Sequence, residues 1–331
     1  MKNLRNIISI KNPLFILVII VSIFIISCKK EIVIKIPEKK PSLVIYSTLV
    51  PYTLPQPKSL NIKIESSLSF YDTTKVSVIK DALVLFYKNG NFIDTIRYID
   101  SLKNYPIPLN FYPNVGDNVR MKVIKDGYKS VSAATTISSK VEIKNISVIP
   151  FAYFNDIGEV FSEIDITFDD PANELNYYEV AVSELSTEIA FNYDNPENYY
   201  SLSSNDNIIT SESYYPSPLN FDLKPPLSLL FNDKEINGTE HILKIYYMPV
   251  WIGGAVRCLS DNYINIHLRN VTEEYYKFKT TMIEQLNNQK ENILYGMGEP
   301  LNVYTNIENG YGVFAGFNND IKTYHQEQIN Y

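Results

Sequence analysis

The chain has 331 residues, a formal net charge of −7 and only two cysteines, Cys28 and Cys258. The acidic balance offers no broad basic surface to nucleic acid, and two cysteines exclude a secreted enzyme held together by several disulfides. A chain of this length must be stabilised by the burial of apolar side chains, and the length suggests two domains.

The first residues have the pattern of a secretion signal. Three basic residues precede an almost unbroken apolar run over residues 13–26; they are Lys2, Arg5 and Lys11. A run of about 14 residues is shorter than the roughly 20 that a helix needs to span a bilayer, so it is typical of a signal peptide. We predict a signal peptide over residues 1–27.

A lipid attachment site follows the apolar run. Residues 25–28 read Ile-Ile-Ser-Cys, which resembles the bacterial lipobox. Signal peptidase II cuts such a motif before the cysteine, whose thiol and new amine are then acylated. We therefore predict that Cys28 carries acyl chains such as palmitate, since two or three chains give lasting attachment. The alternative is a short membrane-spanning anchor with a chance cysteine.

Residues 28–41 read as a lipidated tether. They combine lysines and glutamates with two prolines, which favours an extended chain. The lysines lie against anionic headgroups or are simply solvated; they are Lys29, Lys30, Lys35, Lys39 and Lys40. The tether is expected to keep the folded part close to a membrane.

Strand patterns begin after the tether. Runs rich in β-branched and aromatic residues, bounded by turn residues, cover residues 43–49, 60–64, 82–87, 119–125 and 128–137. Asn89-Gly90 and Asp126-Gly127 are hairpin signals between such runs. Short strands with regular turns predict a β-sandwich of the immunoglobulin or transthyretin type over residues 42–139.

A second β-rich domain is predicted over residues 140–331. Asp169-Asp170-Pro171 and Asn309-Gly310 read as turns between strands. The predicted strands cover residues 141–149, 162–168, 177–185, 241–249, 263–268, 301–305 and 312–317. The predicted fold class is mainly β, with two β-sandwich domains.

One amphipathic helix is predicted over residues 272–288. Thr272 is a suitable N-cap, and Glu273 and Glu274 favour the positive end of the helix dipole. Apolar residues recur at helical spacing and predict a core-facing stripe; they are Tyr275, Phe278, Met282 and Leu286. Asn287-Asn288 is expected to end the helix.

Residues 192–226 differ from the rest of the second domain. They are crowded with Asn, Ser, Tyr and Pro and show little periodicity, which predicts a long surface segment. Tyrosine supplies a large, stiff contact area with a polar tip. We therefore predict a binding surface built from two tyrosine doublets, Tyr199, Tyr200, Tyr214 and Tyr215.

The sequence shows little sign of catalytic chemistry. None of the three histidines, His241, His267 and His325, stands in a pair spaced for a metal. Nucleophile elbows, Walker loops and dinucleotide fingerprints are missing, and Cys258 has no neighbouring base. Asp169 and Asp170 could ligate calcium, although a turn before proline explains them more simply. We predict no enzyme activity, no cofactor and no metal site.

The order of motifs in the mature chain resembles a known family. Beside the lipobox, the matching strings are residues 43–46, residues 80–86 before an Asn-Gly turn, Phe168-Asp169-Asp170-Pro171, Asn176-Tyr177-Tyr178, Glu274-Tyr275-Tyr276 and residues 299–314. The last string, EPLNVYTNIENGYGVF, is the most specific. This order resembles the Bacteroidota lipoproteins catalogued as domain of unknown function 4249.

The resemblance implies more about location than about chemistry, because the family has no established biochemical activity. Its members typically accompany TonB-dependent outer-membrane transporters. This implies a non-enzymatic outer-membrane lipoprotein that serves as an accessory or ligand-capture partner. The alternative is a stand-alone surface lipoprotein that binds carbohydrate or peptide. Lys29-Lys30-Glu31 lacks the acidic run that often directs such proteins to the cell surface, so the periplasmic and cell-surface sides both stay open.

Overall fold

The computed structural model describes residues 40–51, 61–68, 77–107, 111, 113–156, 158–184, 199–209, 227–248, 251–252, 255–256, 262–295 and 301–326. A compact unit begins at Pro41 and runs to Tyr331. Cys28, Tyr214, Tyr215 and Cys258 lie outside the described residues, so what was predicted for them stays a prediction.

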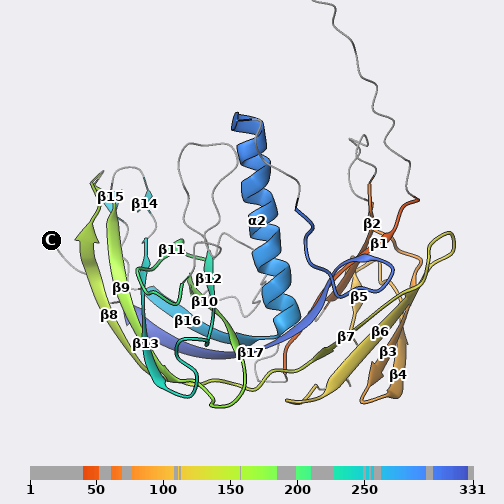
Figure 1. Cartoon of the computed structure of the whole chain (residues 1–331), viewed down its shortest axis with the longest axis horizontal. Coiled ribbons are helices and arrows are strands. Elements are labelled where there is room, and N and C mark those ends of the chain that lie inside the picture. Colours follow the sequence, from red (N-terminus) through yellow and green to blue (C-terminus); the bar gives the residue numbers. More distant parts are fainter. Residues whose placement is uncertain are drawn as a thin grey trace, which may run out of the picture. The chain divides into compact units, whose positions relative to one another are not determined.

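The described chain is mainly β with a single helix near its C-terminus, as predicted (Figure 1). A central sheet has the strand order β12-β10-β16-β17-β1-β2-β5. In that order its strands are β12 (Ser228–Asn232), β10 (Tyr177–Glu184), β16 (Asn262–Val271), β17 (Tyr311–Gln326), β1 (Leu43–Leu49), β2 (Asn61–Ser66) and β5 (Tyr105–Pro106). Strands β1 and β17 pair in parallel, and the other pairs in this sheet are antiparallel.

Two four-stranded antiparallel sheets belong to the two halves of the chain. The N-terminal sheet has the order β4 (Asn91–Ile96), β3 (Leu83–Lys88), β6 (Asn118–Ile124) and β7 (Val131–Thr136). The C-terminal sheet has the order β11 (Leu202–Ser203), β13 (Glu240–Tyr247), β9 (Val160–Asp169) and β8 (Ile143–Phe154). Strands β14 (Trp251–Ile252) and β15 (Ala255–Val256) pair antiparallel in a two-stranded sheet.

Each four-stranded sheet packs against one part of the central sheet. In the N-terminal half, alternate residues of β1 and β2 meet alternate residues of β3 and β6, such as Ile45, Ile64, Val84 and Met121. In the C-terminal half, alternate residues of β10 and β16 meet those of β9 and β13. Each fully buried aliphatic side chain contributes about 1.5–3 kcal/mol, so these two cores supply most of the stabilisation.

A third apolar cluster lies on the opposite face of the central sheet, under helix α2 (Glu273–Tyr295). Because side chains alternate along β17, Val313, Ala315 and Phe317 face the helix while Phe314 enters the N-terminal core. The predicted stripe is confirmed where Tyr275 and Phe278 are buried and Met282 packs beside them. The middle of the central sheet is therefore covered on both faces (Figure 1).

The central sheet crosses the predicted domain boundary at residues 139 and 140. The N-terminal core ends in this region at Ile137, and the C-terminal core begins at Val141. However, β17 pairs with β1 on one side and β16 on the other, and Phe314 belongs to the N-terminal core. The halves thus have separate cores and a shared sheet.

Two predictions about regular structure are wrong. Residues 301–305 do not form a strand, because two of their backbone N–H groups donate to side chains of helix α2. Leu301 N–H donates to Gln285 Oε1 at 2.5 Å, and Tyr304 N–H donates to Thr281 Oγ1 at 2.8 Å. The helix does not end at Asn287-Asn288 but continues to Tyr295. Good helix formers such as Lys290 and Glu291 follow the two asparagines, and Gly296 is the first strong stop signal.

Candidate functional site

The helix-facing side of the central sheet carries a buried cluster of polar side chains. Glu179 on β10 and Arg269 on β16 are direct cross-strand partners, and both point away from the apolar C-terminal core. Arg269 Nη1 lies 2.6 Å from Glu179 Oε2, with side-chain exposures of 8% and 2%. A charge pair this deeply buried is stable only if further hydrogen bonds satisfy both groups.

Three hydroxyl groups complete this ion pair. Ser228 Oγ donates to Glu179 Oε1 at 2.8 Å, and Tyr275 of helix α2 donates to Glu179 Oε2 at 3.0 Å. Arg269 Nη2 donates to the hydroxyl of Tyr199 at 3.2 Å, and its guanidinium also lies over the ring of Phe317. The cluster therefore ties β10, β12, β16, β17 and the helix together.

The ionisation of both groups follows from their pairing. Burial alone would raise the pKa of Glu179, but Arg269 outweighs it and the pKa falls to about 2. Burial likewise opposes the charge of Arg269, and the carboxylate of Glu179 outweighs it, so the pKa of Arg269 is raised. Both groups are charged at neutral pH, and each stabilises the other.

His267 lies on the same face of β16, two residues from Arg269. Its Nε2 is 2.9 Å from Ser183 Oγ, and its Nδ1 is 3.2 Å from the side-chain amide of Asn319. Burial, and then the charge of Arg269, lower the pKa of His267 to about 3, with Glu179 opposing. His267 is therefore neutral at physiological pH.

These hydrogen bonds resemble the arrangement of a catalytic triad, with Ser183 as the nucleophile, His267 as the base and Asn319 as the group that orients the base. The electrostatics of this arrangement disagree with that chemistry. A general base must hold a proton during the reaction, and both the burial of His267 and the charge of Arg269 disfavour the imidazolium ion. Ser183 is also only 5% exposed. We interpret these contacts as structural hydrogen bonds.

Two of the four predicted binding tyrosines are in the described part of the chain, and neither lies free on a surface. Residues 199 and 200 run along the edge of β10, where Tyr199 pairs with Ser183 and Tyr200 N–H donates to the carbonyl of Val182 at 2.9 Å. Side chains alternate there, so Tyr199 is half-buried at Arg269 while Tyr200 enters the C-terminal core. The prediction that Tyr200 is exposed is wrong, because its ring packs against Tyr247 and is only 7% exposed.

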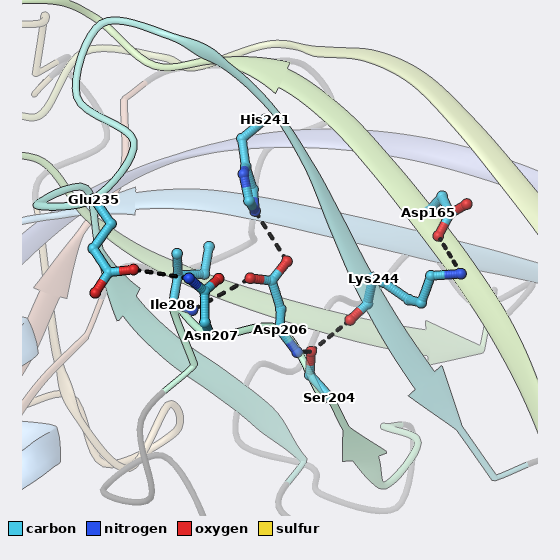
Figure 2. Close-up of polar contacts among 8 residues, drawn as sticks. All are labelled: Asp165, Ser204, Asp206, Asn207, Ile208, Glu235, His241 and Lys244. Carbon is cyan, nitrogen blue, oxygen red and sulfur yellow. Dashed lines mark hydrogen bonds and ion pairs between the residues drawn. The ribbon is translucent and has the colours of Figure 1, made fainter.

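The residues that follow, 204–208, are fastened to β13 by side chains (Figure 2). Asp206 Oδ2 lies 3.0 Å from His241 Nε2, and Ser204 Oγ donates to the carbonyl of Lys244. Asn207 Nδ2 donates to Glu235 at 3.0 Å. Residues 199–209, here called the strap, are therefore attached both to β10 and to β13.

The most family-specific string has a structural role in the described residues. The side chain of Asn306 donates to the carbonyl of Phe314 at 2.7 Å and accepts from its N–H at 3.0 Å. Gly312 has a φ of +98°, and a Cβ placed on it would lie 2.0 Å from the carbonyl oxygen of Ile45. Only glycine fits there, so this residue permits the close parallel pairing of β1 and β17.

The remaining candidates are also engaged. His325 stacks on Tyr263 at 4.4 Å between ring centroids. Asp169 pairs with Lys144 at 3.0 Å, while Asp170 is buried and accepts hydrogen bonds from Tyr178 and Gly238. Within the described ranges, no three His, Cys, Asp or Glu side chains gather to hold a metal, and no helix is long and apolar enough to cross a membrane.

Comparison with known proteins gives one match. The family model described as "Domain of unknown function (DUF4249)" matches residues 29–323. No curated protein and no solved structure matches the chain. Since the family model covers most of its length, this chain belongs to the DUF4249 family.

Proposed function

We propose that this chain is a non-enzymatic lipoprotein of the outer membrane, acylated on Cys28, which serves as an accessory or ligand-capture partner of a TonB-dependent transporter. The observation that carries the proposal is the junction at Cys28. The apolar run and lipobox end at this residue, and the family match begins at residue 29. Cleavage before Cys28 would therefore release the part of the chain that the family shares.

The length of the tether supports a role close to the membrane. The compact unit begins at Pro41, which leaves residues 29–40 between it and Cys28. Even fully extended, such a tether spans at most about 40 Å. The folded part would thus stay within reach of an integral protein of the same membrane.

The buried polar groups support a binding role over a catalytic one. Glu179, Arg269 and His267 bond to strands and helix and hold them in place. The strap adds a fixed attachment for the tyrosine-rich segment, since Tyr214 follows Ile209 by only five residues. Rigid attachment lowers the entropy lost when a loop meets a partner.

The anchor is tested by metabolic labelling. We expect the wild-type chain to incorporate labelled palmitate and Cys28→Ser to incorporate none, because the acceptor thiol is lost. Cys258→Ser is the matched control and should label like wild type, since Cys258 is the other cysteine of the chain. Undiminished labelling of Cys28→Ser would exclude lipidation at this residue.

The partner is tested by co-purification of the full chain in detergent. We expect an outer-membrane transporter to co-purify with wild type and to be lost from the double variant Tyr214→Ser/Tyr215→Ser. Tyr263→Ser removes a tyrosine that is 47% exposed on another strand and should retain the transporter. If wild type retains no transporter, the stand-alone binding role replaces this proposal.

A further inference from the structure

The two halves of the chain carry opposite net charges. Residues 42–139 hold 11 lysines and arginines against seven aspartates and glutamates, whereas residues 140–331 hold 11 against 28. The N-terminal half therefore has a net charge of +4 and the C-terminal half one of −17. Such a contrast between the halves of one chain is typical of a protein that meets an anionic surface with one half only.

The outer face of the N-terminal sheet, β4-β3-β6-β7, carries exposed positive charge (Figure 1). Because side chains alternate along β6, Met121 enters the N-terminal core while Arg120 and Lys122 are exposed on the opposite face. Among the described residues, neither of these cations forms an ion pair. Four other lysines of this half do pair with carboxylates; they are Lys63, Lys80, Lys88 and Lys125.

Aromatic and aliphatic side chains flank the two cations on the same face. In the strand register, Tyr87 of β3 lies opposite Arg120, and Leu85 lies opposite Lys122. Phe92 of β4 lies on the other side of Tyr87 and is 55% exposed, and the centroids of these two rings are 5.7 Å apart. A protein that rests on a bilayer uses this combination, because apolar groups enter the headgroup boundary while cations stay at its surface.

We propose that this face lies against the anionic headgroups of the membrane that holds Cys28. We define it by Leu85, Tyr87, Phe92, Arg120 and Lys122 and call it the basic face. The proposal rests on the proposed function, from which it takes the acyl anchor. An exposed cation without a counter-charge in the protein is free to meet a lipid phosphate, and each one adds to the attraction.

The position of the tether favours a membrane as the occupant of the basic face. The compact unit begins at Pro41 and β1 at Leu43, so the tether enters the N-terminal half. The anchor therefore holds the positive half, rather than the acidic one, next to the headgroups. The same headgroups repel the C-terminal half, so attraction and repulsion favour one orientation of the molecule.

The experiment is flotation of unacylated residues 29–331, which contain the whole compact unit, with lipid vesicles. We expect binding to vesicles that contain phosphatidylglycerol, no binding to pure phosphatidylcholine, and loss of binding in high salt. Arg120→Gln/Lys122→Gln should weaken the binding about 30-fold, since each cation contributes about fivefold. Lys234→Gln/Lys322→Gln is the matched control, because it removes two exposed cations from the C-terminal half and should bind like wild type.

Three outcomes of the flotation would overturn the proposal. The first is equal binding to both kinds of vesicle, or binding to neither. The second is undiminished binding of Arg120→Gln/Lys122→Gln, which would assign the attraction to the lysines of the tether. The third is self-association of the wild type without vesicles that this variant abolishes, because the basic face would then bind the acidic half of a second copy. Flotation does not need the acyl chains, so its failure leaves the anchor to the palmitate test.

A second measurement needs no variant and uses the acylated full chain in vesicles. A water-soluble acetylating reagent should modify Lys122 more slowly in anionic than in neutral vesicles, because the headgroups cover it. Lys322 is the internal control, since it is exposed on β17 in the C-terminal half and should react equally in both. Equal rates for Lys122 in the two kinds of vesicle would show that the basic face does not lie on the membrane.

Discussion

The two halves of the molecule fill their interiors differently. The N-terminal core consists of apolar side chains and Tyr105, and β6 alternates cleanly between buried and exposed residues from Asn118 to Ile124. In the C-terminal half, β10 is buried over most of its length, because the core covers one face and helix α2 the other. The second face carries Glu179, while Arg269 and His267 lie beside it on β16. A strand covered on both faces can place charge inside the protein if a partner strand supplies the opposite charge.

The largest effect is expected from breaking the interior charge pair. Arg269→Met would leave Glu179 buried without its counter-ion and should lower the free energy of unfolding by about 3–5 kcal/mol. In the N-terminal half, Lys63 pairs with Glu65, but the lysine side chain is 59% exposed. Lys63→Met removes this exposed ion pair and should lower the free energy of unfolding by no more than about 1 kcal/mol.

Urea unfolding of both variants measures this difference between the halves. The double variant Glu179→Leu/Arg269→Met should recover much of the loss, since no uncompensated charge remains. Equal losses in Arg269→Met and Lys63→Met would show that the pair is not buried in solution.

The next effect is a dependence of stability on pH that originates in the C-terminal half. His267 has a pKa of about 3 in the folded chain, against about 6.5 when unfolded. The unfolded state therefore binds the proton first, so stability is full above pH 6.5 and falls as the pH drops toward 3. Between pH 8 and 4.5 the loss should be about 2.7 kcal/mol.

His267→Gln should remove this slope, as measured by urea unfolding at each pH. His325→Gln is the control, because His325 lies near the end of the same sheet and is only partly buried. The pKa of Glu179 is also lowered, to about 2, and its contribution is lost only below its unfolded value of about 4.5. A slope above pH 5 that is retained in His267→Gln would assign the effect to other groups.

The smallest effect concerns the strand that joins the halves. In Gly312→Ala, the new Cβ would sit on a backbone with positive φ and would clash with the carbonyl oxygen of Ile45. The variant should therefore lower the free energy of unfolding by about 2–3 kcal/mol. Gly90→Ala is the matched variant inside the N-terminal half, because Gly90 has a similar φ of +80° but open space at the Cβ position. It should cost only about 1 kcal/mol. Thermal unfolding compares the two, and equal shifts would show that backbone strain alone limits position 312.

Local patterns predicted the N-terminal half well. The alternation in residues 43–49 gave the bounds of β1, and Asn89-Gly90 predicted the turn between β3 and β4, where both residues have positive φ. Such signals are readable because each residue is constrained by its immediate neighbours.

The C-terminal half depends on partners that are distant in the sequence. Residues 301–305 have the composition of a strand, yet side chains of helix α2 bind their backbone. The pairing of Glu179 with Arg269 follows from the register of β10 and β16 across a separation of 90 residues. The local sign of this cluster in the sequence is a charged residue, Glu179, within a strand-like run. That sign does not show that Arg269 is the partner. The same limit applies to Tyr200, whose burial depends on its pairing along β10.

The parallel pairing of β1 with β17 also determines when the protein can finish folding. These strands lie near opposite ends of the chain, with Val44 opposite Tyr311. During synthesis the N-terminus emerges first, so β1 can pair with β2 early but can pair with β17 only when almost the whole chain has left the ribosome. Contacts this distant in sequence form slowly. The central sheet therefore cannot be completed until β17, the strand in its middle, is available.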